Sequence, residues 1–159
     1  MADLKFEVNL NGLFNVMDGA YALVTELPDD GADFFPPPGP FHPQPSNMIA
    51  QTDQPLKVKF HWRVKGALAL IMAGKWECAV YLEEMGPGEY PGSPYKTTVP
   101  LVAKFDHTYD VAVDVPPIST AGLYRVTVAV SLIGPAPALA ALPVAAFSDI
   151  GILKAYDAA

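Results

Sequence analysis

The chain is poor in cysteine and in charge. It has a single cysteine, Cys78, among 159 residues, which excludes an internal disulfide and the disulfide framework of small secreted scaffolds. Charged residues make up only 17% of the sequence, against roughly 25% in ordinary soluble domains. Hydrophobic residues make up 51%. Some of this apolar surplus is therefore expected to lie at contacts between subunits.

Basic residues are scarcer than acidic ones. The chain has 10 lysine and arginine residues against 17 aspartate and glutamate residues, which gives a formal net charge of −7 at pH 7. Because binding to a phosphate backbone requires an extended basic surface, no nucleic-acid partner is expected.

Neither a targeting segment nor a membrane-spanning helix is evident. The N-terminal sequence MADLKFEV lacks the basic segment and apolar run of a signal peptide. The default expectation is a cytoplasmic protein, although a processed or exported chain, extracellular or part of a particle, would look the same. The uncharged stretch 126–148 is long enough for a span, but Pro135, Pro137 and Pro143 interrupt it. A membrane span is therefore not expected.

Motifs for metal binding and catalysis are also missing. The three histidines, His42, His61 and His107, share no HxH or HExxH spacing, and there is no CxxC pair. Neither a metal ion nor another cofactor is predicted. Cys78 shares a strand face with Trp76, which predicts a buried, inert thiol. With no GxSxG sequence, phosphate-binding glycine loop or dinucleotide fingerprint, we expect no enzymatic activity.

What the sequence does have is alternation of apolar and polar residues, most clearly in 57–65, KVKFHWRVK. Successive side chains of a β-strand point to opposite sides, so this segment separates into an apolar face and a basic face. The apolar residues are Val58, Phe60, Trp62 and Val64, and the basic stripe is Lys57, Lys59, His61, Arg63 and Lys65. We predict a half-buried antiparallel strand with Trp62 in the core.

Further strands are expected at 4–10, 13–17, 20–27, 75–84, 99–105, 109–115, 120–133 and 150–156. The 17 prolines are about twice the usual share and favour short strands joined by stiff loops. The fold class that follows is all-β, an antiparallel β-sandwich with long Pro-rich loops, formed by residues 1–159 as a single domain.

Two pairings are predicted between these strands. Asn11-Gly12 suits a two-residue turn, which would join 4–10 and 13–17 in a hairpin. Glu77 and Glu83 point outward from 75–84 and are natural cross-strand partners for the basic stripe. The strands 57–65 and 75–84 would then be neighbours.

Two further segments, 150–156 and 67–74, consist mostly of apolar residues. The alternate residues Ile150, Ile152, Lys154 and Tyr156 predict a terminal strand with one apolar face. The apolar run 67–74 fits either a buried strand or a helical turn, since periodicity does not separate the two in so short a segment.

One stretch resembles a known superfold. The sequence Gly122-Leu123-Tyr124-Arg125-Val126 is similar to the corner that opens the F strand of immunoglobulin-like and fibronectin-like sandwiches. There, a tyrosine hydroxyl bonds back to the preceding corner. Val126 would take the place of the second family cysteine, and Trp62 resembles the tryptophan on strand C. The resemblance implies an immunoglobulin-like β-sandwich and says almost nothing about activity.

Two proline-containing segments suggest a function: a Pro-rich arm at 28–46 and a Pro/Ala-rich apolar loop at 134–147. Proline stiffens both, and exposed apolar segments mark interaction surfaces. The residues expected to contact neighbouring copies are Phe34, Phe35, Pro37, Phe41, Pro43, Pro137, Leu139, Leu142, Pro143 and Val144. We predict a non-enzymatic structural or assembly protein that forms a homo-oligomer or filament through these segments and strand edges.

An alternative function is ligand binding. Tyr90 and Tyr95 flank a Pro/Gly-rich loop and could form an aromatic platform for a carbohydrate or another small molecule. In this interpretation the sandwich is a binding module.

Overall fold

Two β-sheets pack face to face in the computed structural model, which describes residues 2–6, 12–16, 20–26, 48–86, 88–135 and 141–157. Nearly all strand pairs are antiparallel, and the described residues contain no α-helix. The predicted all-β class and two-sheet architecture are confirmed. The Pro-rich arm at 28–46 lies outside the described residues.

The first sheet, sheet A, has strand order β1-β4-β6-β10, and β3 pairs with the end of β6. Its strands are β1 (Ala2–Asp3), β3 (Asn15–Val16), β4 (Tyr21–Glu26), β6 (Leu56–Lys65) and β10 (Asp106–Val115). The predicted strands at 20–27, 57–65 and 109–115 are confirmed as β4, β6 and β10.

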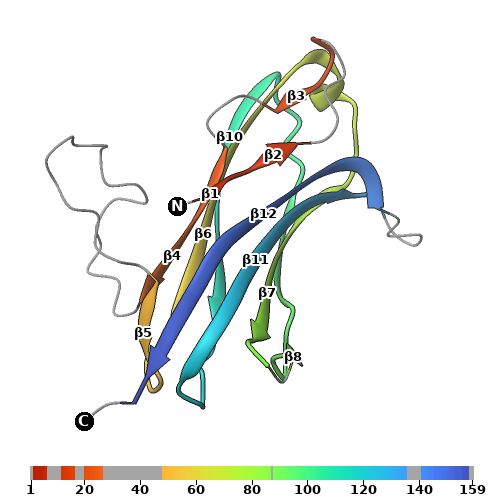
Figure 1. Cartoon of the computed structure of the whole chain (residues 1–159). Coiled ribbons are helices and arrows are strands. Elements are labelled where there is room, and N and C mark those ends of the chain that lie inside the picture. The colour runs from red at the N-terminus through yellow and green to blue at the C-terminus, as the bar shows by residue number, and fades with distance from the viewer. Residues whose placement is uncertain are drawn as a thin grey trace, which may run out of the picture.

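The second sheet, sheet B, has strand order β2-β12-β11-β7-β8, with β9 also paired to β7 and β5 parallel to the end of β12. Its strands are β2 (Lys5–Phe6), β5 (Ile49–Gln51), β7 (Lys75–Glu84), β8 (Gly88–Glu89), β9 (Tyr95–Pro100), β11 (Gly122–Ile133) and β12 (Ala141–Tyr156). In Figure 1, β12, β11 and β7 run side by side as one layer in front of β4 and β6.

The core between the sheets is built around large aromatic side chains. Trp62 of β6 stacks on Tyr109 of β10 with ring centroids 5.0 Å apart, and meets Trp76 of β7 edge-on at 5.5 Å. All three are buried. Aromatic pairs in these geometries stabilise a core beyond the area that they bury. The prediction that Trp62 lies in the core is confirmed.

The predicted strand at 4–10 differs in the structure. Ala2 and Asp3 pair with β4 in sheet A, whereas Lys5 and Phe6 pair with β12 in sheet B. The chain changes sheet at Leu4, whose side chain is buried in the core. The segment 2–6 therefore adds one short strand to each sheet, β1 beside β4 and β2 beside β12.

The predicted hairpin between 4–10 and 13–17 is wrong for the residues that the structure describes. Asn15 and Val16 instead pair with Lys65 and Val64 at the end of β6. The alternation of 4–10 is compatible with either sheet, and the N-terminal residues are divided between the two.

The predicted pairing of the strands 57–65 and 75–84 is also wrong, because β6 and β7 belong to different sheets. Both strands direct a tryptophan into the same core, so their apolar faces oppose each other across the sandwich. The neighbours of β6 are β4 and β10. The neighbours of β7 are β11, β8 and β9.

Three boundaries are corrected. The strand expected at 99–105 is β9, which runs from Tyr95 to Pro100 and ends where proline removes an amide donor. The loop expected at 134–147 extends no further than 140, because Ala141 already begins β12 and pairs with Ile133. The ambiguous run 67–74 contains the 3₁₀ helix η1 (Ala67–Leu70).

Gly66 explains how η1 fits against the chain that precedes β3. Its φ is +147°, and a Cβ at this position would lie 2.1 Å from the carbonyl oxygen of Leu13. The same carbonyl accepts a 2.9 Å hydrogen bond from the amide of Leu68. Only glycine permits this close backbone contact.

Candidate interaction surfaces

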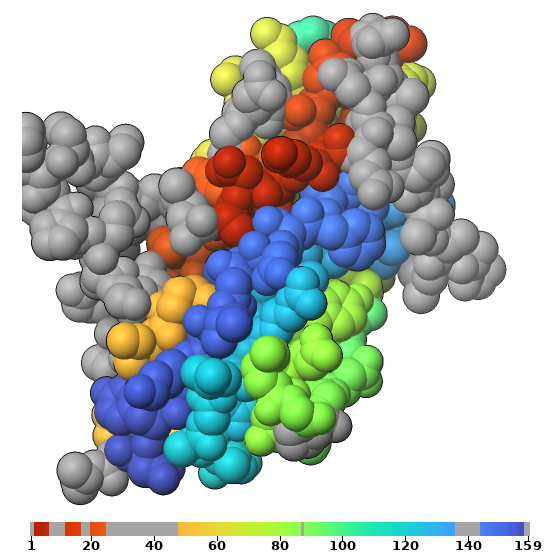
Figure 2. Space-filling model, viewed as in Figure 1, coloured from red at the N-terminus to blue at the C-terminus, as the bar shows by residue number. Residues whose placement is uncertain are grey.

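The outer face of sheet B carries large apolar side chains that are open to solvent. They belong to β5, β7, β11 and β12 and form what we call the apolar outer face. Its members, with exposed fractions, are Ile49 (49%), Tyr81 (38%), Leu123 (47%), Phe147 (56%), Ile152 (51%) and Tyr156 (42%). Figure 2 shows the surface of β12, β11 and β7 that contains most of them. Isolated exposed apolar residues are normal, but several on one face indicate an interaction site.

A β-bulge in β12 determines which residues reach this face. Thr127 of β11 pairs with Asp149, and the next residue back, Val126, pairs with Gly151. Ile150 is therefore an extra residue that has no paired residue on β11. A single extra residue inverts which side chains point inward beyond it.

The inversion decides which residues of the last strand enter the core. Leu153 and Ala155 are buried, whereas Ile152 and Tyr156 are exposed on the outside. The predicted single apolar face is therefore divided, because Ile150 packs partly against the core whereas Ile152 and Tyr156 lie outside. The physical reason is the bulge, which a strict alternation of residues does not include.

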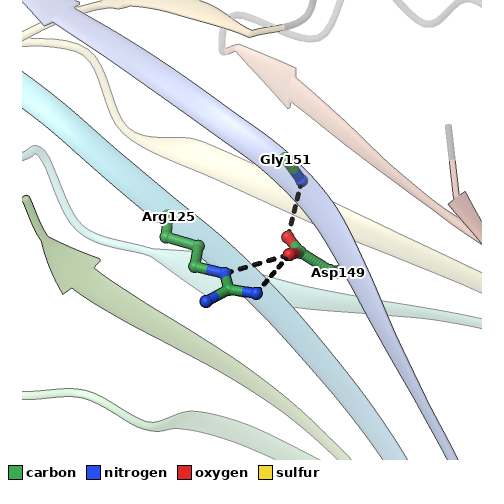
Figure 3. A network of polar contacts seen from close by, with 3 residues as sticks. All are labelled: Arg125, Asp149 and Gly151. Atoms are coloured by element: carbon green, nitrogen blue, oxygen red, sulfur yellow. Dashed lines mark hydrogen bonds and ion pairs between the residues drawn. The ribbon is translucent and has the colours of Figure 1, made fainter.

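A polar network holds the bulge in place (Figure 3). The guanidinium of Arg125 donates two hydrogen bonds to Asp149 Oδ2, from Nε at 2.9 Å and from a terminal nitrogen at 2.7 Å. Asp149 Oδ1 accepts a 3.0 Å bond from the amide of Gly151. The hydrogen bond from Arg125 lowers the pKa of Asp149, and the carboxylate raises the pKa of Arg125. The network thus places an ion pair among apolar side chains.

The outer face of sheet A has the opposite character, because ion pairs cover β6 and β10. Arg63 donates a bidentate pair of hydrogen bonds to Asp106, with Nε 2.7 Å from Oδ1. His61 Nδ1 lies 2.6 Å from Asp110 Oδ1. Three members of the basic stripe, Lys57, His61 and Arg63, thus lie against aspartates of β10, and not against the glutamates of β7 as predicted.

Lys59 departs from the predicted exposed stripe. Its side chain is on the outer face of sheet A, but the residue is only 5% exposed. In register it lies between Leu23 of β4 and Ala112 of β10. The two flanking positions are apolar, and Leu23 is also buried.

Most of the predicted interface residues lie outside the described part of the chain. Phe34, Phe35, Pro37, Phe41, Pro43, Pro137 and Leu139 fall in the undescribed ranges. Leu142 and Pro143 belong to β12, and their side chains are not described. Val144 also belongs to β12, and its side chain is 3% exposed within the hydrophobic core. Its place is therefore inside the subunit and not on the described surface.

The predicted ligand platform at Tyr90 and Tyr95 is engaged in contacts within the subunit. The Tyr90 hydroxyl accepts a 2.9 Å hydrogen bond from the amide of Ser119 and lies 3.1 Å from its Oγ. The Tyr95 hydroxyl donates to the carbonyl of Pro91 at 3.4 Å. Both rings pack partly against the core. Binding of a carbohydrate or another small molecule by this pair stays a prediction.

No grouping of three or more His, Cys, Asp or Glu residues suited to a metal ion occurs in the described ranges. His107 packs edge-on against Tyr109, with ring centroids 4.7 Å apart. Cys78 is fully buried, and this burial, together with the nearby charge of Glu77, raises the pKa of its thiol. Its chemistry is therefore that of a buried apolar residue.

The helical content of the described ranges also bears on membrane crossing. None of the helices found there combines the length and the apolar character that spanning a bilayer requires.

The apolar outer face was not among the predictions from the sequence, although one local signal was present. Asp149-Ile150-Gly151 combines a residue that caps backbone amides with a glycine at φ +122°, and an isolated glycine in a strand pattern often marks a bulge. Recognising that bulge would have assigned Ile152 and Tyr156 to the outside.

Comparison with models of known protein families gives no match to this chain, and no curated protein matches it. Function is therefore inferred from the surfaces described above.

Proposed function

We propose that this protein is a non-enzymatic structural or assembly protein whose copies associate through the apolar outer face of sheet B. The observation that carries this proposal is the set of exposed apolar side chains on that face. The Pro-rich arm and the apolar loop beyond β11 would add to the contact. The product is a closed homo-oligomer or, if the contact is head to tail, a filament.

The contrast between the two sheets supports this choice of surface. On sheet A, Lys57, His61 and Arg63 of β6 lie against aspartates of β10, which leaves a polar exterior suited to water. On sheet B, Phe147 and Ile152 are more than half exposed, and Arg125 lies opposite Ile152 on the neighbouring strand β11. Aromatic residues, aliphatic anchors and arginine are typical of the energetically dominant parts of protein interfaces.

A second copy is the occupant that fits this face. A two-fold contact brings the same patch from both subunits together. Arg125 and Asp149 lie at its centre as a preformed ion pair, so each copy presents both signs of charge and neither repels its partner. Association would also remove from water the apolar side chains that the fold leaves exposed.

We further propose that the sandwich is immunoglobulin-like. In that superfold, strands A, B and E are neighbours in one sheet, and C, F and G in the other. The orders β4-β6-β10 and β7-β11-β12 match these two sets. Tyr124 of β11 bonds to the carbonyl of Thr120 at 2.7 Å, as the tyrosine corner requires. Trp76 on β7 would then correspond to the tryptophan of strand C, in place of Trp62, which lies on β6.

The test is light scattering over a range of concentrations. The protein should form oligomers, and the double substitution Phe147→Glu, Ile152→Glu should raise the concentration needed for assembly at least roughly tenfold, because hot-spot side chains are worth about 2 kcal/mol each. A matched control is Ile71→Glu. Ile71 is 78% exposed next to η1 and away from the face, and its change should leave assembly unaltered.

Two outcomes decide between this surface and the alternatives. A wild-type protein that remains monomeric at every concentration rules out the assembly proposal. A deletion of residues 34–45 that abolishes assembly, while the double substitution does not, would transfer the contact from the sheet face to the Pro-rich arm.

A further inference from the structure

Strand β10 forms an open edge of sheet A. Among the described residues it pairs only with β6. No described backbone hydrogen bond outside that ladder involves residues 106–115. The strand has ten residues and no proline, and Pro116-Pro117 follows its end. A long edge of this kind can accept another strand.

The edges of sheet B are less suited to this. Strand β9 begins directly after Pro94 and ends at Pro100, and β8 has only two residues. Proline at the ends of an edge strand and very short edge strands both discourage further pairing. Strand β10 has neither feature.

A groove of about 380 Å³ follows this edge. Residues 107–111 of β10 form one side, and Val99, Pro100 and Val102 form the other. The two sides are connected by a 2.8 Å hydrogen bond that the amide of Val102 donates to the hydroxyl of Tyr109. Because Val99, Pro100 and Val102 are apolar, an added strand would place its inward side chains against an apolar surface.

Of the side chains that β10 directs outward, every second one is an aspartate. Asp106, Asp110 and Asp114 follow one another at intervals of four residues, and the side chain of Asp114 is 82% exposed. An added strand would present its own outward side chains directly beside these carboxylates, where opposite charges stabilise pairing and like charges oppose it.

The existing neighbour of β10 displays the chemistry that this edge accepts. Strand β6 directs apolar residues into the core and basic residues outward, and Lys57, His61 and Arg63 contact the three aspartates. A second strand with the same alternation would meet the groove with its apolar side and the carboxylates with its basic side.

Within the ranges that the structure describes, no segment of this chain is available as the second strand. In an antiparallel pairing of two β10 edges centred on Asp110, Asp110 of one copy would face Asp110 of the other, and Asp106 would face Asp114. The one segment of the sequence with the required alternation, Leu56–Lys65, already occupies the interior of sheet A. The occupant must therefore come from a different protein.

We propose that the β10 edge binds an extended segment of another protein in which basic and apolar residues alternate, by adding it as a strand to sheet A. This interaction is separate from the self-association through sheet B and does not depend on it.

The experiment uses the full-length protein and a labelled synthetic peptide with the sequence of residues 56–65, LKVKFHWRVK, as the probe. Fluorescence anisotropy measures binding, and hydrogen exchange reports on the amides of 106–115. The peptide should bind and slow exchange in that segment. A peptide with glutamate in place of its four lysine and arginine residues, and a scrambled peptide without alternation, should not bind.

Two charge reversals on the protein complete the test. Asp114→Lys should raise the dissociation constant roughly three- to tenfold, because a cross-strand attraction becomes a repulsion. Glu89→Lys, an equal charge change on β8 in sheet B, should leave it within about twofold. The proposal is overturned if the probe does not bind, if the control peptides bind equally well, or if protection appears only outside 106–115. It is also overturned if Asp114→Lys alters self-association in sedimentation, since the edge would then contact a second copy.

Discussion

Arg125 of β11 and Asp149 of β12 form an ion pair that spans the bulge at Ile150, with both guanidinium hydrogen bonds directed to the same carboxylate oxygen. The other oxygen accepts the amide hydrogen of Gly151. One side chain therefore connects two strands and fixes the backbone that follows. This connection determines which side chains of β12 point outward beyond Ile150. The composition of the apolar outer face therefore depends on it.

The bulge should be sensitive to acid. The pKa of Asp149 is lowered in the folded protein, so its carboxylate stabilises the fold above the unfolded-state pKa of about 3.9. This contribution is lost as the pH falls through the lower, folded-state pKa. Thermal unfolding of Asp149→Asn should show a reduced melting temperature at pH 7 and a smaller difference from wild type at pH 3. An equal difference at both pH values would contradict this account.

Gly151 should not tolerate a side chain. Its φ is +122°, and an added Cβ would meet nothing closer than Met48 at 3.7 Å, so the cost of Gly151→Ala comes from backbone strain and not from a clash. We expect a loss of about 1–3 kcal/mol in the free energy of unfolding, measured in denaturant. Gly122→Ala is the matched control, because Gly122 has no such φ and an added Cβ would make only an ordinary van der Waals contact with the Tyr124 ring, at 3.6 Å. Its effect should stay within about 0.5 kcal/mol.

The hydroxyl of Tyr124 should contribute to stability in its own right. It donates a 2.7 Å hydrogen bond to the carbonyl of Thr120, and the residue is fully buried. Tyr124→Phe should therefore lower the free energy of unfolding by about 0.5–1.5 kcal/mol. Tyr81→Phe removes a hydroxyl from the exposed side of the same sheet and should change stability by less than about 0.5 kcal/mol. Equal effects of the two substitutions would argue against a structural role for the Tyr124 bond.

Cys78 should be unreactive while the protein is folded. The side chain is fully buried, and burial together with Glu77 raises its thiol pKa. Because the thiolate is the reactive form, a thiol reagent at pH 8 should modify the native protein only at the rate of unfolding. It should modify one thiol per chain at once in denaturant. Rapid labelling under native conditions would show that the strand β7 opens locally.

The strongest strand predictions came from segments with strict alternation. The predictions for 57–65, 75–84, 109–115 and 120–133 all correspond to long strands of the structure. In each, the expected apolar residues form the core. Alternation is reliable here because these strands bury one face only, and burial of that face outweighs other local preferences.

Pairing and boundaries could not be predicted in the same way. The glutamates of β7 and the aspartates of β10 have the same charge, so both were equally suitable neighbours for the basic stripe of β6. The ladders of β7 with β11 and β9 assign it to the other sheet, where Trp76 meets Trp62 across the core. The segment 141–147 gave no strand signal, because small apolar residues without alternation are equally common in loops.

The sequence by itself determined that the chain forms half-buried strands, which residues of the regular strands face inward, and that no disulfide holds them. These are local properties, because the side-chain period of a strand follows from its own backbone. The tertiary structure alone decided which strands are neighbours, where the N-terminal segment changes sheet, and that the bulge at Ile150 turns Ile152 and Tyr156 outward. These depend on hydrogen-bond ladders between residues far apart in the chain, and a ladder can gain or skip a residue without any change in the pattern of either strand.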